Sequence, residues 1–373
     1  MKCIYCGFDS LYKERIGGKC PHCERPYAFE PKTASGDPTD LWFKQALDRV
    51  SGHGAVRFTP EHLSYELARA NRRKYGASTL AGCLIVPLVF IGAIVAFIVG
   101  PWVLLLIVGA LIALPFYVHN HRKVAALQED QIGSWLEKWK AAHGLPAGLI
   151  QPQAALPPAE SLEAMRTELE QYSFDRAVIC DRRETVDLLL ANNFHFENNC
   201  AVLSIDGYPA SVFDLVLGML KRNPKLHIFA LHDATLAGCS MAHRLATDPA
   251  WFVGQGPIFD VGLRPVHAKA FEGQWKEAKE DAQATTCPPG VTDEEFQWLR
   301  RYNLSLAAVR PEQVIKRLFR AISERKVDAT DLDHRDSTAL ATSFADSERV
   351  ARMDAVIFSS EASASDGGGD SFG

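Results

Sequence analysis

Neither sign of charge dominates this chain of 373 residues, which carries 40 Lys and Arg against 45 Asp and Glu. The formal net charge of −5 excludes a chain that is basic throughout, as many nucleic-acid-binding proteins are. The balance changes along the sequence, because residues 1–77 hold more basic than acidic side chains and the region after residue 327 is mostly acidic. A chain of this length can form two or three folded units.

An apolar leader is also missing from the first residues, MKCIYCGFDS, and we expect no cleavable signal peptide. The sequence contains nine cysteines, and four of them form two C-x-x-C pairs. The other five are scattered, mostly among apolar residues, which is typical of buried free thiols. This usage favours a reducing compartment with metal-bound thiolates over a disulfide framework.

The two C-x-x-C pairs are separated by thirteen residues and consist of Cys3, Cys6, Cys20 and Cys23. Two such pairs complete the closed, tetrahedral four-sulfur shell of structural zinc. With this spacing, residues 1–30 resemble the zinc-ribbon family, which implies a small module folded by its metal that mediates contacts and performs no chemistry. The alternative is a redox-active dithiol pair. His22 lies between two of the ligands, but four sulfurs already fill the shell.

The longest gap in charge runs from residue 75 to residue 121, where no Lys, Arg, Asp or Glu occurs. Residues 78–99 are long enough to span the hydrocarbon core of a bilayer, and residues 102–118 are near the lower limit. Gly100-Pro101 separates the two runs. We therefore expect a two-helix transmembrane hairpin over 78–118, with the lipid bilayer as a partner. The alternative is a buried helical hairpin in a soluble core.

Basic residues flank both outer ends of this expected hairpin, namely Arg72, Arg73, Lys74, Arg122 and Lys123. Basic residues concentrate on the cytoplasmic side of membrane proteins, which places both termini in the cytoplasm. The thiolate-rich ribbon favours the same side. The sequence thus predicts a multi-pass protein of the inner (cytoplasmic) membrane.

The remaining sequence divides by composition. We expect a linker and juxtamembrane helices over 31–77, an amphipathic helix and a Pro/Ala-rich linker over 119–158, an α/β domain with C-terminal helices over 159–327, and an acidic, Gly/Ser-rich flexible tail over 328–373. The fold class is therefore multidomain, with a zinc ribbon, a transmembrane hairpin and a cytoplasmic parallel-sheet domain.

Within 159–327, short β-branched runs alternate with segments of helical spacing, which predicts βαβ units around a parallel sheet. Asp181, Asp206 and Asp233 each follow an apolar run. Ligands of such sheets bind beyond the carboxyl ends of the strands, where three carboxylates can hold Mg²⁺. The alternative is that these residues are ordinary helix caps and turn residues.

Two stretches, 200–209 (CAVLSIDGYP) and 225–238 (KLHIFALHDATLAG), resemble the Toprim domain of type IIB topoisomerase A subunits and their meiotic strand-breaking relatives. The resemblance covers roughly 175–265. It implies a Mg²⁺ site formed by an acidic residue after the first strand and a D-x-D pair, which supports DNA strand chemistry. By position, Asp181 stands where the family has Glu, Asp233 matches the first Asp of the pair, and Gly238 matches the motif glycine.

Two departures weaken the implied site. Thr235 stands where the second Asp of the pair belongs, and Asp181 is one methylene shorter than Glu. Mg²⁺ affinity depends on the number of charged ligands and their close geometry. Asp206 is a candidate to compensate for the missing carboxylate. The family's winged-helix domain with its nucleophilic tyrosine has no place ahead of this region, and Tyr208 belongs to the G-Y-P turn, so topoisomerase activity is not expected.

Three functions remain open from the sequence. The first is a binding protein whose degenerate Toprim-like domain recognises a protein partner, nucleic acid or nucleotide. The second is a Mg²⁺-dependent nuclease or phosphotransfer enzyme that uses Asp181, Asp206 and Asp233, with His232 as general base. The third is a structural scaffold at the membrane. The missing second Asp favours the first.

Overall fold

The computed structural model describes residues 1–32, 36–76, 129–151 and 174–331, with residues 272 and 280 excepted. The chain forms two compact units. The N-terminal unit is built from Met1–Ala46 and Ser64–Leu145, and the sheet unit from Leu47–Leu63 and Pro146–Gly373. The chain therefore contributes a short segment, Leu47–Leu63, to the sheet unit long before the first strand.

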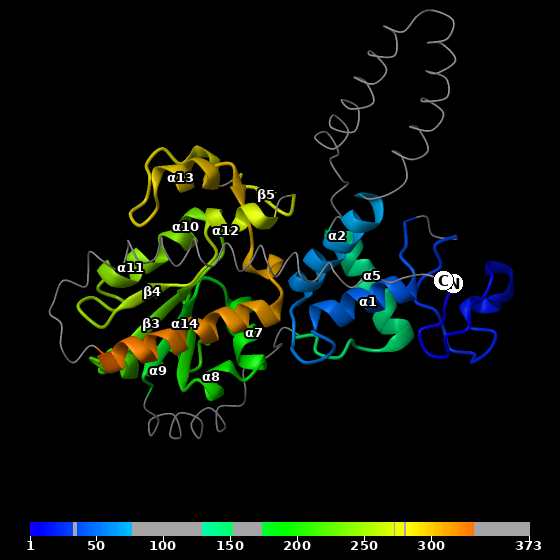
Figure 1. Ribbon diagram of the computed structural model, residues 1–373, viewed down its shortest axis with the longest axis horizontal. Helices are drawn as coiled ribbons and strands as arrows, with labels where there is room; N and C mark the ends of the chain where they lie inside the picture. Colours follow the sequence, from blue (N-terminus) through cyan, green and yellow to red (C-terminus); the bar gives the residue numbers. More distant parts are fainter. Residues whose placement is uncertain (33–35, 77–128, 152–173, 272, 280, 332–373) are drawn as a thin grey trace, which may run out of the picture. The chain divides into compact units, whose positions relative to one another are not determined.

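The N-terminal unit begins with the cysteine-rich ribbon, coloured blue in Figure 1. It contains two short 3₁₀ helices, η1 (Tyr12–Glu14) and η2 (Ile16–Gly18), and two isolated antiparallel bridges. These bridges join Lys2 to Asp9 and Lys19 to Pro26. So little regular structure leaves the ribbon almost without a core of its own.

Between the ribbon and the first strand, the described residues form the helices α1 (Asp40–Val50), α2 (Pro60–Gly76) and α5 (Glu129–His143). Within the N-terminal unit, the rings of Phe29, Phe43 and Trp139 pack together, with 4.9 Å between the centroids of Phe43 and Trp139. The buried carboxylate of Asp40 accepts hydrogen bonds from the amides of residues 28 and 29 and contacts His143 Nε2 at 2.6 Å. Asp40 thus fastens the end of the ribbon to α1 and α5.

The sheet unit contains the predicted parallel sheet. Its strands lie in the order β2 (Cys200–Ser204), β1 (Arg176–Cys180), β3 (His227–Leu231) and β4 (Ile258–Asp260), all parallel. The inner strands are buried, as expected for continuous apolar runs in parallel sheets. Residues of α9 and α11 such as Val216, Leu220, Met241 and Leu245 complete the core on one face.

The helices of this unit alternate with the strands (Figure 1). They are α7 (Arg183–Ala191), α8 (Phe194–Glu197), α9 (Phe213–Leu220), α10 (Leu236–Cys239), α11 (Met241–Thr247), α12 (Pro265–Ala268), α13 (Asp293–Leu299) and α14 (Pro311–Asp331). A two-stranded antiparallel ladder, β5 (Lys276–Glu277) with β6 (Tyr302–Asn303), and three 3₁₀ turns, η3 (Lys269–Phe271), η4 (Asp281–Gln283) and η5 (Leu306–Ala308), complete it.

The strand order fixes where a site can form. The chain moves outward from β1 to β2 on one side and then crosses to β3 and β4 on the other. Connections therefore diverge between β1 and β3, and ligands of open parallel sheets bind at such a switch point, beyond the carboxyl ends of the strands. Asp181 follows β1 directly and Asp233 follows β3 by two residues, so both lie at this point.

The expectation of a transmembrane hairpin is corrected. Among the residues that the structure describes, no helix is long and apolar enough to cross a membrane. The 21-residue α14 has the length, but charged residues recur along it, whereas a spanning helix needs about 20 predominantly apolar residues. The expected hairpin, 78–118, lies outside the described residues, as do 332–373 of the expected tail. The described residues therefore support neither the expected hairpin nor the expected multi-pass location in the inner membrane.

Candidate functional site

The four cysteines of the ribbon form a compact cluster. Their sulfurs all lie within 4.8 Å of one another, with 3.7 Å between Cys3 and Cys23 and between Cys6 and Cys20. A tetrahedral shell with zinc–sulfur bonds of about 2.3 Å places its sulfurs roughly 3.8 Å apart. Disulfide sulfurs would be bonded at about 2.05 Å, and all four thiols are free. The cluster can therefore hold a metal ion.

Each pair of cysteines sits on a knuckle with the same backbone. The amide of Cys3 donates to the carbonyl of Phe8, and the amide of Cys20 donates to the carbonyl of Arg25, both at 2.9 Å. The turn in the first knuckle is made by Gly7 at a φ of 73°, a conformation that favours glycine. These hydrogen bonds hold the backbone so that both sulfurs of each knuckle face the cluster.

His22 is not a member of the cluster. Its ring is exposed and stacks on Phe8, with 5.7 Å between centroids and 15° between planes. The expectation that four sulfurs suffice therefore agrees with the geometry.

At the switch point of the sheet, Asp181 and Asp233 are in direct contact. The amide of Asp233 donates to Oδ2 of Asp181 at 2.7 Å. The buried carboxylate of Asp233 is itself occupied on both oxygens: Oδ1 accepts from the amide of Leu306 at 2.7 Å, and Oδ2 accepts from Arg182 at 3.2 Å. Asp233 thus anchors the start of η5 instead of facing an open cleft.

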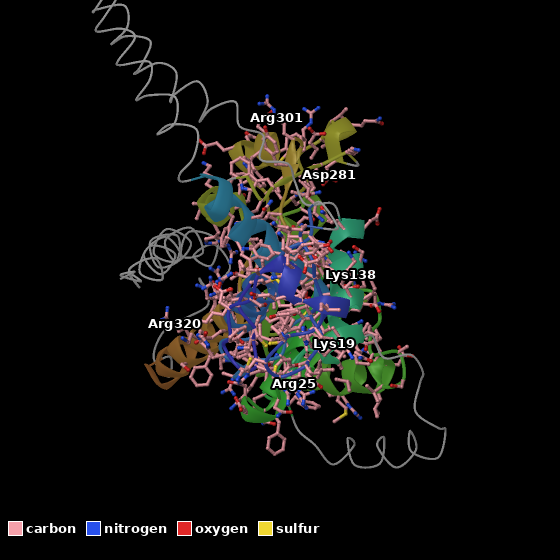
Figure 2. The ribbon with its side chains drawn as sticks, turned by 90° about the vertical axis from the view of Figure 1, so that its right-hand side faces the viewer. Lys19, Arg25, Lys138, Asp281, Arg301 and Arg320 are labelled. Atoms are coloured by element: carbon pink, nitrogen blue, oxygen red, sulfur yellow. The ribbon has the colours of Figure 1, made fainter. Side chains whose placement is uncertain are left out.

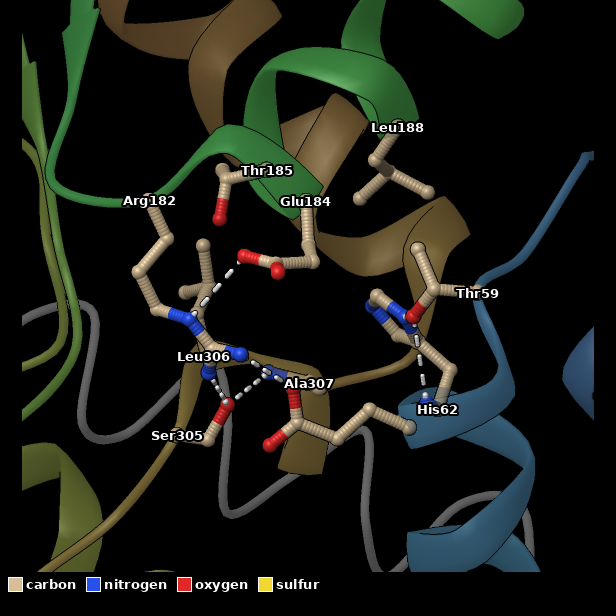
Figure 3. Close-up of a pocket in the computed structure, with 10 residues that line it drawn as sticks. Thr59, His62, Arg182, Glu184, Thr185, Leu188, Ser305, Leu306 and Ala307 are labelled. Atoms are coloured by element: carbon tan, nitrogen blue, oxygen red, sulfur yellow. Dashed lines mark hydrogen bonds and ion pairs between the residues drawn. The ribbon is translucent and has the colours of Figure 1, made fainter. Parts of the chain in front are cut away.

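Arg182 lies among three carboxylates, and Figure 3 shows it beside one of them, Glu184. Its guanidinium contacts Glu61 at 3.0 Å, Asp233 at 3.2 Å and Glu184 at 3.4 Å, and it donates to the hydroxyl of Ser305 at 3.1 Å. Burial opposes the charge of Arg182, but these carboxylates raise the pKa of Arg182 further above its usual value. The positive charge that a divalent ion would bring to this edge of the sheet is already supplied by the protein.

Asp181 is the least satisfied group at the switch point. Its Oδ1 is buried and has no hydrogen-bond partner among the described residues. Burial, and then the nearby charge of Asp233, raise the pKa of Asp181 to about 7. A carboxyl group in this position changes its charge near neutral pH.

Asp206 does not join the pair. It is exposed in the turn after β2, where its amide donates to the hydroxyl of Ser204 at 3.2 Å. In the part of the chain that the structure describes, the four cysteines are the one group of three or more His, Cys, Asp or Glu ligand atoms close enough to share an ion. The structure thus brings Asp181 and Asp233 together and does not assemble a three-carboxylate site with Asp206.

His232 is fully buried between two hydrogen-bond acceptors. Its Nδ1 lies 2.8 Å from the carbonyl oxygen of Asp233, and its Nε2 lies 2.9 Å from Oδ1 of Asp260. Burial disfavours the charged ring, but Asp260 more than offsets it and raises the pKa of His232. Both ring nitrogens are engaged as donors, so His232 has no free lone pair with which to act as a base.

Asp260 and its partners form a hydrogen-bonded polar cluster that was not predicted from the sequence. Arg264 donates to Asp260 and forms a two-pronged contact with Glu295 at 2.7 and 2.9 Å. Burial opposes ionisation of Asp260, but His232 and Arg264 hold the pKa of Asp260 well below its usual range. A sequence signal was available, because Asp260 lies in a short apolar stretch and is the last residue of β4, but its partner Arg264 also binds Glu295, which is remote in sequence.

Two glycines allow this packing. A Cβ on Gly238 would lie 2.5 Å from the carbonyl oxygen of Asp233, and one on Gly262 would lie 2.3 Å from the ring of His232. Thr235 accepts a hydrogen bond from the amide of Gly238 at 3.0 Å and caps α10. Thr235 therefore has a local structural role at the start of α10.

Tyr208 is held in place by its hydroxyl, which donates to Asp187 at 2.7 Å. Its own carbonyl accepts from the amide of Ser204, which closes the G-Y-P turn. Both contacts are structural, as the sequence analysis expected.

Two pockets lie among the described residues of the sheet unit, one beside Arg182 and a second beside Arg317. The chain matches no family model, no curated protein and no solved structure.

Proposed function

We propose that this protein is a non-catalytic binding protein in two parts. In the N-terminal unit, zinc held by the four cysteines folds the ribbon. In the sheet unit, a degenerate Toprim-like domain binds a macromolecular partner or nucleic acid without cleaving it. The observation that carries the proposal is the state of Asp233, whose two carboxylate oxygens are taken by Arg182 and by the amide of Leu306.

Zinc is the metal that suits the ribbon best. Four thiolates in a tetrahedral arrangement select zinc among the common divalent ions, and a closed shell leaves no position for a substrate. When bound, the ion would tie the two knuckles together, which the ribbon needs because it has little core of its own.

The Toprim-like assignment has two supports. Parallel strands β1 and β3 present Asp181 and Asp233 at one edge, in the places of the family's acidic residues. Gly238 packs closely against Asp233, which gives a reason for the motif glycine.

Mg²⁺ does not fit the acids of this edge. Asp233 is saturated, Thr235 caps a helix, Asp206 lies outside the pair, and Arg182 neutralises the neighbouring carboxylates. A hard divalent cation prefers several charged oxygen ligands and water, and here it would have to displace a guanidinium.

A Mg²⁺-dependent nuclease is the second candidate, because Oδ1 of Asp181 is buried without a partner among the described residues. Calorimetric titration of Mg²⁺ and Mn²⁺ into the full chain, together with cleavage assays on DNA and RNA, separates the two functions. With zinc in the ribbon, we expect no saturable binding of Mg²⁺ or Mn²⁺ and no cleavage of DNA or RNA. Metal binding and cleavage that are both lost in Asp233→Ala would establish the nuclease instead. Arg182→Gln is the companion variant. It removes the positive charge beside Glu61, Glu184 and Asp233 and so tests whether these carboxylates can then bind the ion.

A further inference from the structure

The two knuckles of the ribbon repeat one pattern of planar side chains. In the first knuckle, Tyr5 stands one residue before the second cysteine, and Phe8 stands two residues after it. In the second knuckle, His22 and Arg25 stand at the matching places. Because the backbones of the knuckles carry the same hydrogen bonds, these four side chains are related by an approximate twofold repeat around the cysteine cluster.

The planar side chains pair across the knuckles. The guanidinium of Arg25 lies over the ring of Tyr5, 4.1 Å from its centroid, and the ring of His22 stacks on Phe8. Each pair thus takes one member from each knuckle. All four side chains are exposed, with 44% of Tyr5 and 43% of Phe8 open to solvent. The ribbon therefore carries two platforms, each a stacked pair with exposed side chains, beside the metal cluster. The Tyr5 ring also lies beside His143 of α5, with 5.6 Å between their centroids and 3.1 Å between the Tyr5 hydroxyl and Nδ1 of His143.

Basic side chains accompany the platforms. Lys2 and Lys19 each precede the first cysteine of a knuckle, and Lys13 lies between the knuckles; all three are exposed. Lys19 and Arg25 are labelled in Figure 2. Of the four acids in residues 1–30, Asp9 pairs with the terminal amine and Glu30 pairs with Arg15. Each of these pairs is neutral, so the charges that remain exposed on the ribbon are Lys2, Lys13, Lys19 and Arg25 against Glu14 and Glu24.

We propose that the ribbon binds single-stranded nucleic acid. Bases would stack on the Tyr5–Arg25 and Phe8–His22 platforms, while Lys13 and Lys19 contact phosphates. Only single strands offer free base faces, so duplexes are poor ligands. Zinc with four thiolates carries two net negative charges, and the phosphates therefore pass over the lysines and not over the cluster. The inference rests on the proposed function, because the platforms exist only when metal holds the knuckles together.

The competing occupant is a protein surface. Leu11 and Ile16 are 70% and 86% exposed on the same ribbon, and a protein partner would bury these aliphatic side chains. Base stacking needs the planar groups instead. The observation that favours nucleic acid is the duplicated pairing of planar groups with flanking lysines, which an apolar docking site does not require.

Fluorescence anisotropy of the zinc-loaded full chain tests the inference, with labelled DNA and RNA single strands of about 15 nucleotides and a duplex of equal length. We expect Tyr5→Ala with Phe8→Ala to weaken single-strand binding by at least roughly tenfold. Tyr5→Phe with Phe8→Tyr keeps both platforms, so binding should stay within about twofold. Leu11→Ser with Ile16→Ser is the matched control and should bind like the wild type.

Zinc content and circular dichroism of every variant separate the two proposals. If the wild type contains no zinc, the proposed function fails. If zinc and fold are retained but single strands do not bind at low salt, or bind no better than the duplex, this inference alone is overturned. Equal loss of single-strand binding in the Leu11→Ser, Ile16→Ser control would also overturn it, because binding would then not depend specifically on the planar platforms.

Discussion

The main-chain amide of Asp233 donates a 2.7 Å hydrogen bond to Oδ2 of Asp181, and this contact joins the ends of β1 and β3. It leaves the other oxygen of Asp181 buried and unpartnered among the described residues. The carboxyl is therefore held in place by a single donor in a setting that disfavours its charge. A group in such a setting links stability to pH.

Replacement of Asp181 by Asn should remove part of the pH dependence of stability. The pKa of Asp181 is raised from 3.8 to about 7 by burial and by Asp233, so the folded chain holds a proton that the unfolded chain releases. The stability that this proton contributes is fully present below the pKa of the unfolded chain, 3.8. It is lost as the pH rises from about 4 to about 7 and does not change at higher pH. Asn keeps the acceptor for the amide of Asp233 and carries no titrating group.

Urea denaturation at pH 5 and pH 8 measures the effect. The free energy of unfolding of Asp181→Asn, minus that of the wild type, should be larger at pH 8 than at pH 5. Asp214→Asn, an acid in α9 outside this cluster, is the control and should show no comparable shift. A difference between wild type and Asp181→Asn that stays constant with pH would contradict the prediction.

Removal of the Arg182 guanidinium should destabilise the sheet unit. Glu61, Glu184 and Asp233 would lose their common counter-charge. Arg182 is only partly buried, so solvent screens the loss, and we expect Arg182→Ala to cost about 1–3 kcal/mol. Lys225→Ala, an exposed basic residue before β3, should change stability by less than about 0.5 kcal/mol. Equal effects of both substitutions in urea denaturation would show that the ion pairs contribute little.

The sheet was predictable from local sequence. Buried parallel strands are continuous apolar runs, and one such run, 227–231 (HIFAL), forms β3. The polar residue that follows such a run marks the carboxyl end of the strand. The proximity of Asp181 and Asp233 then follows from strand order, which places β1 beside β3.

The partners of these acids were not predictable. Glu61 reaches Arg182 from the start of α2, more than a hundred residues earlier in the chain, and the amide of Leu306 reaches Asp233 from η5. No local pattern encodes contacts of that separation. The sequence therefore indicated that Asp181 and Asp233 lie at one edge, but not that Asp206 stays apart from them, nor that an arginine and a backbone amide bind the carboxylate of Asp233.

Alanine at Gly262 should be strongly destabilising. Its Cβ would lie 2.3–2.5 Å from three atoms of the His232 ring, which is held on both sides by hydrogen bonds and cannot move away. We expect a loss of about 2–4 kcal/mol. Gly218→Ala in α9 is the matched control, because nothing lies within 4 Å of its Cβ position. That substitution should stabilise the helix by about 0.5–1 kcal/mol. Similar losses from both glycines in urea denaturation would refute the steric explanation.

Chelation of the metal should unfold the ribbon and spare the sheet unit. The four cysteines belong to the N-terminal unit, and the ribbon depends on them because its own core is small. Excess EDTA, or Cys3→Ser without chelator, should abolish bound zinc in elemental analysis. Both should also remove the hydrogen-exchange protection of the amides of Cys3 and Cys20, which are hydrogen-bonded within the knuckles. Amides of β1 and β3 should keep their protection. Cys287→Ser alters a thiol outside the cluster and should retain both zinc and ribbon protection. A Cys3→Ser chain that keeps its ribbon amides protected would show that the knuckles fold without metal.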